Sequence, residues 1–80
     1  MYKYEDFKNI VFLEENQKTF LEIRDQVHKL LSTARYIDMS QAIEGIGGSN
    51  WDNMAYVDRL LELGEIHEIE VVGNNRIFTK

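Results

Sequence analysis

Hydrophobic residues recur every three or four positions over most of residues 4–63, which is the spacing of one buried helical face. The pattern predicts a helical segment over about residues 4–13 and a longer helix over about 17–35. A short helix over about 39–45 and a further helix over about 49–63 follow. The positions expected in the core are Phe20, Ile23, Val27, Leu30, Leu31 and Ala34 in the long helix, and Trp51, Met54, Val57, Leu60 and Leu61 in the last.

Polar residues and glycines indicate where these helices begin and end. Asn16 is expected to cap the long helix and Ser49 the last one, because short polar side chains accept hydrogen bonds from the free amides of a first turn. Asp38, with Gln41 three residues later, matches a capping box. Gly64 is expected to end the last helix in the left-handed conformation.

After Gly64 the pattern changes to that of strands. Residues 66–72 and 75–79 are rich in β-branched and apolar residues, and Gly73 with Asn74 supplies turn residues that tolerate positive φ. Helices followed by a hairpin predict an α+β fold. With 80 residues and no composition shift, one domain is expected over residues 1–80.

From about residue 17 onward the chain resembles the winged helix-turn-helix superfamily of small bacterial regulators. The matching segments are Val57-Asp58-Arg59-Leu60, Leu63-Gly64-Glu65-Ile66 and Arg76-Ile77-Phe78-Thr79. The resemblance implies a winged helix: a three-helix helix-turn-helix core with a C-terminal two-stranded β-hairpin wing, here preceded by an extra N-terminal helical segment over residues 1–15. In members that read DNA, the third helix of the core enters the major groove and the wing offers basic side chains to DNA.

The net charge of the chain disfavours DNA as the partner. Fourteen acidic against nine basic residues give a net charge of −5, spread along the chain without a basic stripe. A negative domain is repelled by phosphate backbones at long range. The chain has no cysteine, no run approaching the roughly 18 apolar residues of a membrane span and no signal-like N-terminus, so a cytoplasmic protein is expected.

If the last helix faces a partner, its outward positions are expected to be Asp52, Asn53, Tyr56, Arg59 and Glu62. The candidate partner or DNA contacts are Asn53, Tyr56 and Arg59 on this helix and Arg76 on the wing. Asn53 and Arg59 suit adenine and guanine edges, respectively. The favoured alternative is that Arg59 pairs with neighbouring acids on a solvated face, which contributes little stability.

The N-terminal segment carries more apolar surface than one short helix needs. This excess suggests a homodimer seam formed by Tyr4, Phe7, Val11 and Phe12. The Trp51 side chain is expected to be buried in the core; an exposed Trp51 would instead be an interface anchor.

The sequence offers no constellation for catalysis, metal binding or a cofactor. His28 and His67 lie far apart without metal-ligand spacing, and a helix cap is the better account of Ser49 than a nucleophile. The glycines at 45, 47 and 48 match no phosphate-binding fingerprint and are interpreted as a turn between helices. We therefore expect no enzyme, no cofactor and no metal.

Three hypotheses of function follow. The first is a non-enzymatic winged-helix interaction module that binds a protein partner or itself through apolar and acidic surface. The second is a winged-helix DNA-binding transcriptional regulator. The third is an acidic inhibitor or immunity-type protein that covers a basic site.

Overall fold

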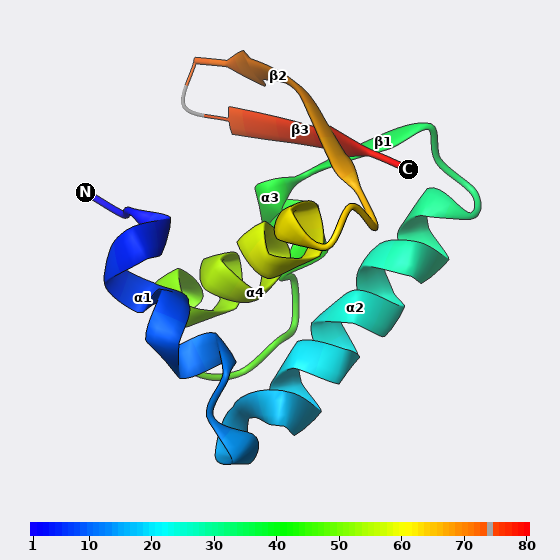
Figure 1. Cartoon of the computed structure of the whole chain (residues 1–80). Coiled ribbons are helices and arrows are strands. Elements are labelled where there is room, and N and C mark those ends of the chain that lie inside the picture. Colours follow the sequence, from blue (N-terminus) through cyan, green and yellow to red (C-terminus); the bar gives the residue numbers. More distant parts are fainter. Residues whose placement is uncertain (74) are drawn as a thin grey trace.

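The computed structural model, which describes residues 1–73 and 75–80, has helices packed against one face of a small sheet (Figure 1). The helices are α1 (Tyr4–Val11), α2 (Gln17–Leu31), α3 (Met39–Ala42) and α4 (Asn50–Glu62), with a 3₁₀ turn, η1 (Glu14–Asn16), before α2. The strands are β1 (Tyr36–Asp38), β2 (His67–Val72) and β3 (Asn75–Thr79). The predicted α+β class is confirmed, and so are both strands of the predicted hairpin.

The three strands form one antiparallel sheet in the order β1-β3-β2. The strand β1 was not predicted, because three residues are too few to show an alternating hydrophobic pattern. In the hairpin, Gly73 has a φ of +63°, as its predicted role in the turn requires, whereas Asn74 lies outside the described residues. A bulge at Ile69 shifts the pairing of β2 with β3 between Glu68 and Glu70.

The ends of the helices follow the predicted signals in part. The capping box at α3 is confirmed: Asp38 Oδ1 accepts from the Gln41 amide at 2.8 Å, and Gln41 Oε1 accepts from the Asp38 amide at 3.0 Å. Gly64 follows α4 with a φ of +73°, as expected. The cap expected from Asn16 is wrong, because its side-chain amide donates instead to the Ile10 carbonyl at 2.9 Å. Ser49 precedes α4 in the predicted cap position, but its side chain makes no capping bond.

Helix α2 is shorter than predicted and ends at Leu31 rather than near residue 35. Ser32 Oγ donates to the Lys29 carbonyl at 2.6 Å, and Thr33 Oγ1 donates to the Leu30 carbonyl at 3.3 Å. Hydroxyl groups that satisfy the last carbonyls of a helix offer the backbone an alternative to another turn. The chain then leaves α2 and becomes β1.

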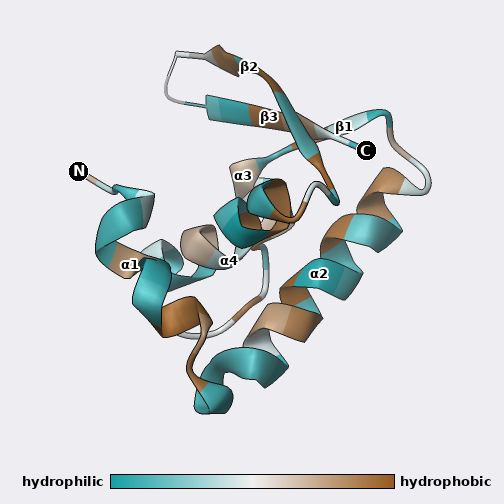
Figure 2. Ribbon diagram, viewed as in Figure 1, coloured by the Kyte–Doolittle hydropathy of each residue, from teal (hydrophilic) through white to brown (hydrophobic). Residues whose placement is uncertain are grey.

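Helix α4 is the central element of the fold, and it packs against α1 on one side and α2 on the other (Figure 1). Hydrophobic and hydrophilic residues alternate along the helices and along β2 and β3, as expected for elements that bury only part of their surface (Figure 2). The core consists of Val11, Ile23, Val27, Leu31, Ile37, Met39, Ala42, Ala55, Tyr56, Val57, Leu60, Ile66 and Phe78. A helix with neighbours on two sides buries more than one stripe of residues.

The predicted buried face of α4 is therefore only partly right. Val57 and Leu60 are fully buried, whereas Met54 and Leu61 are half-buried. The expectation that Trp51 plugs the core is wrong, because 46% of its surface is exposed. Trp51 lies in the first turn of α4, where it packs edge-on against Phe7 of α1 rather than between α4 and α2.

Candidate interaction surface around helix α4 and the sheet

Side chains of the N-terminal segment contact one side of α4. The Tyr2 hydroxyl donates to Asp58 Oδ2 at 2.6 Å, and the Tyr4 hydroxyl donates to Glu62 Oε1. Lys8 Nζ lies 2.8 Å from Glu62 Oε2, while the Phe7 and Trp51 rings meet edge to face with centroids 5.6 Å apart. These contacts span α4 from its first to its last turn, so this side of the helix is occupied by the chain itself.

Asp58 is the centre of a partly buried polar cluster that joins Tyr2, which precedes α1, to α4 and the hairpin. Its carboxylate receives two bonds from the Arg76 guanidinium, at 2.7 and 3.2 Å, besides the bond from Tyr2. Arg76 Nε also donates to Glu68 Oε1 at 2.6 Å. Asp58 is 8% exposed, whereas 25% of the Arg76 side chain is exposed, so the ion pair is only partly withdrawn from water and is satisfied by hydrogen bonds.

The titration behaviour of the cluster reflects its geometry. Burial raises the pKa of the Tyr2 hydroxyl, and its bond to Asp58 raises that pKa further, since removing the proton would place two anions together. Burial alone would lower the pKa of Arg76, but its bonds to Asp58 and Glu68 more than offset this and raise the pKa. Arg76, the candidate contact on the hairpin, is therefore held as a cation whose charge is already matched.

Arg59, the second cationic candidate, is also matched within the chain. Its Nη1 lies 3.2 Å from Glu62 Oε1, and its guanidinium lies over the Phe12 ring, 4.8 Å from the centroid. Bonds from Lys8 and Tyr4, together with the one from Arg59, lower the pKa of Glu62 to about 2. The prediction that Arg59 pairs with a neighbouring acid is confirmed.

The other two candidate contacts, Asn53 and Tyr56, do not face outward. Asn53 is 1% exposed, and its side-chain amide donates to the carbonyls of Ile46 and Gly47 at 3.3 and 3.1 Å. Tyr56 is 3% exposed and packs against the Phe20 ring, where burial raises the pKa of its hydroxyl. The outward orientation predicted for both is wrong, because these positions lie on the side of α4 that meets the glycine turn and α2.

The four residues of the expected homodimer seam are largely used inside the chain. Val11 is 3% exposed, so its side chain is not available to a second subunit. Tyr4 and Phe7 are half-buried and contact Glu62 and Trp51, respectively. Only Phe12, at 53% exposed, retains much of its surface. Packing on α4 therefore explains part of the apolar excess of the N-terminal segment, while Phe12 and Leu13 remain exposed.

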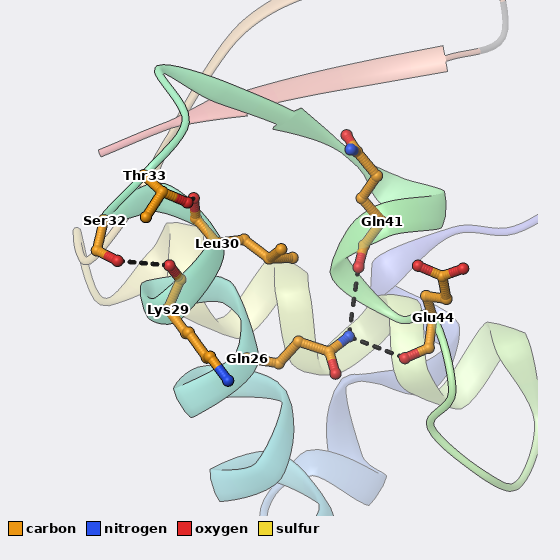
Figure 3. Close-up of a pocket in the computed structure, with 7 residues that line it drawn as sticks. All are labelled: Gln26, Lys29, Leu30, Ser32, Thr33, Gln41 and Glu44. Carbon is orange, nitrogen blue, oxygen red and sulfur yellow. Dashed lines mark hydrogen bonds between the residues drawn. The ribbon is translucent and has the colours of Figure 1, made fainter.

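A hollow of about 420 Å³ lies between the end of α2 and α3 (Figure 3). Gln26 spans it, and its side-chain amide donates to backbone carbonyls of Gln41, Ala42 and Glu44 at 2.9–3.3 Å. These bonds satisfy the last carbonyls of α3 and the Glu44 carbonyl of the turn that follows it, which is a structural role. Ser32, at the rim, donates to a backbone carbonyl rather than to a general base, so its hydroxyl is not activated as a nucleophile.

Within residues 1–73 and 75–80, no group of three or more His, Cys, Asp or Glu side chains is placed to hold a metal ion. His28 Nε2 lies 2.7 Å from Glu65 Oε1, which ties α2 to the segment between α4 and β2. No helix in the described part of the chain has the length and apolar character needed to cross a membrane.

The sheet has an outer face that the sequence analysis did not identify. On its inner face Phe78 and Ile37 are buried against the helices, so Ile77 and Asp38, the next residues along each strand, point away from them. Ile77 pairs across the strands with Asp38 on one side and with Glu70 on the other. The outer sheet face, as we define it, consists of Tyr36, Asp38, Ile69, Glu70, Asn75 and Ile77.

This face is both apolar and acidic. Tyr36 and Ile69 are 59% and 54% exposed, and with Glu70, Asn75 and Ile77 they line a shallow hollow of about 380 Å³. Cross-strand pairing sets this arrangement, and the pairing depends on a register and on a strand, β1, that the hydrophobic pattern does not indicate. In the sequence, only the β-branched residues of β2 and β3 indicated that part of this face exists.

Comparisons of the chain with protein-family models, with curated proteins and with solved structures found no match.

Proposed function

We propose that this chain is a non-enzymatic winged-helix module that binds protein rather than DNA. Its element order supports the winged-helix assignment: α2, α3 and α4 form a helical trio that is followed by the β2–β3 hairpin. The glycine-rich turn precedes α4, and Gly64 separates α4 from the hairpin. In this assignment α4 is the helix that a DNA-reading relative would place in the major groove.

The observation that carries the proposal is the occupation of α4 by α1. A groove-reading helix needs a free face with polar and basic side chains. Here one side of α4 contacts Tyr2, Tyr4 and Phe7, and the opposite side packs against α2. Little of α4 is left to enter a groove, so reading DNA would require α1 to leave.

The pairing of the arginines supports the same conclusion. Arg59 is matched by Glu62, and Arg76 is matched by Asp58 and Glu68. A phosphate would have to displace a carboxylate from each guanidinium, so neither residue offers the free cation that drives counterion release. The net charge of −5 adds long-range repulsion.

Binding of duplex DNA tests the proposal directly. Fluorescence anisotropy would follow a labelled duplex of mixed sequence at about 50 mM salt, where phosphate contacts are strongest, with a basic winged-helix domain as the positive control. We expect no binding by this chain at micromolar concentrations. Binding that weakens steeply towards about 200 mM salt, and that Arg59→Ala or Arg76→Ala reduces, would overturn the proposal in favour of a transcriptional regulator.

Self-association is a separate question within the same proposal. Because three of the four seam residues are turned towards α4 or buried, we expect binding to a different protein rather than to a second copy. Sedimentation velocity over a range of concentrations would show a monomer. A concentration-dependent dimer that Phe12→Ser disrupts would restore the homodimer seam.

A further inference from the structure

We propose that the outer sheet face is the docking site of this module, and that its occupant is a basic segment of another protein carrying an aliphatic side chain between lysines or arginines. The inference rests on the proposed function, because it names the surface and the chemistry through which a protein partner is bound.

The face is available because the helices lie on the other side of the sheet (Figure 1). Ile37 and Phe78 fill the inner side, with 1% and 0% of their surface exposed. The side chains that point the other way include Tyr36 and Ile69, each more than half exposed. Exposed apolar residues gathered on adjacent strands and rimmed by polar ones are typical of an interaction site.

The acidic residues of the outer sheet face indicate which kind of partner it binds. Asp38 and Glu70 flank Ile77 across the three strands, so their backbones lie about 10 Å apart, twice the spacing of neighbouring strands. Bonds from Ser40 and from the Gln41 amide lower the pKa of Asp38 and hold it ionised at neutral pH. Glu70 makes no ion pair within the described part of the chain.

A cationic partner complements both carboxylates while an aliphatic side chain covers Ile77 and Ile69. An arginine adjacent to Asp38 would also lie near the exposed ring of Tyr36, where a guanidinium is attracted to the aromatic face. Arg76, the neighbour of Ile77 in β3, is paired with Asp58 and Glu68, and Arg35 and Lys80 lie beyond the Tyr36–Thr79 pair rather than beside Ile77.

A second copy of this chain suits the face less well. Stacking two outer sheet faces would set Asp38 and Glu70 of one copy near the same acids of the other, and like charges across an interface oppose association. The same acids repel nucleic acid. The chemistry of the face therefore favours a basic protein over a copy of itself.

Selection from a displayed library of random peptides on the immobilised full chain would test the inference. We expect the enriched peptides to carry Lys or Arg on both sides of an aliphatic residue. In anisotropy titrations with an enriched peptide, Glu70→Lys should weaken binding about tenfold or more, which corresponds to about 1.4 kcal/mol. Glu22→Lys makes the same charge change on the exposed surface of α2, and it should have much less effect.

A second measurement keeps the test independent of the variants. On addition of the peptide to the isotope-labelled natural chain, the amide signals of Tyr36, Ile69, Glu70 and Ile77 should shift more than those of α1 and α2. Failure to enrich any peptide, enrichment of acidic peptides, or equal weakening by Glu70→Lys and Glu22→Lys would overturn the inference. Peptides that map to another face would overturn the docking site but leave the protein-binding module in place, whereas duplex DNA binding would overturn the module itself.

Discussion

Replacing Asp58 by alanine removes the acceptor that joins Tyr2, which precedes α1, to α4 and the hairpin. The substitution eliminates the bond from Tyr2 at 2.6 Å and the two bonds from Arg76 at 2.7 and 3.2 Å. Removing one partner of a buried ion pair costs about 3–5 kcal/mol, because the remaining charge stays buried without compensation. Arg76 keeps Glu68 and is partly exposed, so we expect a smaller loss of about 2–3 kcal/mol.

Two controls separate the contributions to this loss. Tyr2→Phe removes only the hydroxyl bond to Asp58 and should cost about 1–2 kcal/mol. Asp25→Ala removes a carboxylate that pairs with Arg24 on the surface of α2, and it should cost less than about 0.5 kcal/mol. In the double variant of Tyr2 and Asp58, the two costs should not add, since both substitutions remove the same bond.

Urea unfolding followed by circular dichroism gives the free energy of unfolding for each variant. The reasoning predicts that Asp58→Ala loses several times more stability than Asp25→Ala. If the two variants were equally stable, or if the costs of Tyr2→Phe and Asp58→Ala added fully, the buried cluster would not hold the N-terminal segment against α4.

Four further predictions concern other parts of the fold. Asn53→Ala should cost about 1–3 kcal/mol in urea unfolding, because it removes the amide that bonds the carbonyls of the glycine turn. Gly64→Ala should cost about 1 kcal/mol or more, since its φ of +73° strains any residue with a Cβ, whereas Gly47→Ala, at a position without positive φ, should be close to neutral. The pKa of Glu62 is lowered from 4.5 to about 2 in the folded chain, so its stabilising effect should be complete above pH 4.5 and decline as the pH falls towards 2, a dependence that Glu62→Gln should weaken in acid unfolding curves. Burial and the bond to Glu62 raise the pKa of Tyr4 above 10, so stability should fall as the pH rises beyond 10, and Tyr4→Phe should reduce that alkaline loss.

The local elements of the fold could be predicted because their signals are local. The capping box of Asp38 and Gln41 lies within four residues, and the Gly64 stop and the strands around Gly73 depend on neighbours in sequence. Each signal reflects a backbone conformation that the residue itself favours. The helices and the hairpin followed from such signals, with errors of a few residues at their ends.

The surroundings of α4 could not be predicted in the same way. A helical period assigns one buried face, and it therefore placed Asn53 and Tyr56 on the outside and Trp51 in the core. The structure reverses this, because α1 covers a second side of α4 and the glycine turn meets a third. These are contacts between segments up to 58 residues apart, such as Tyr4 with Glu62, and no pattern within one helix indicates them.

The cross-strand neighbours of the outer sheet face were hidden for a related reason. The strand β1 has three residues, and its pairing with β3 brings Asp38 beside Ile77 across a separation of 39 residues along the chain. The sequence indicated that Asp38 caps α3. It did not indicate that Asp38 also lies beside Ile77, because that neighbour is set by the order of the strands in the sheet. Register is set by burial of the inner face, which only the complete fold defines.

The proposal depends above all on the contact between α1 and α4, which nuclear Overhauser effects would detect in solution. We expect such effects between the Phe7 ring and the Trp51 indole, and slow amide exchange in the middle of α4, in the natural chain at neutral pH. Absence of those effects, together with fast exchange in α4 and sharp, averaged signals for residues 1–12, would contradict it. The face of α4 would then be open, and the case for a protein-binding module over a DNA reader would lose its main support.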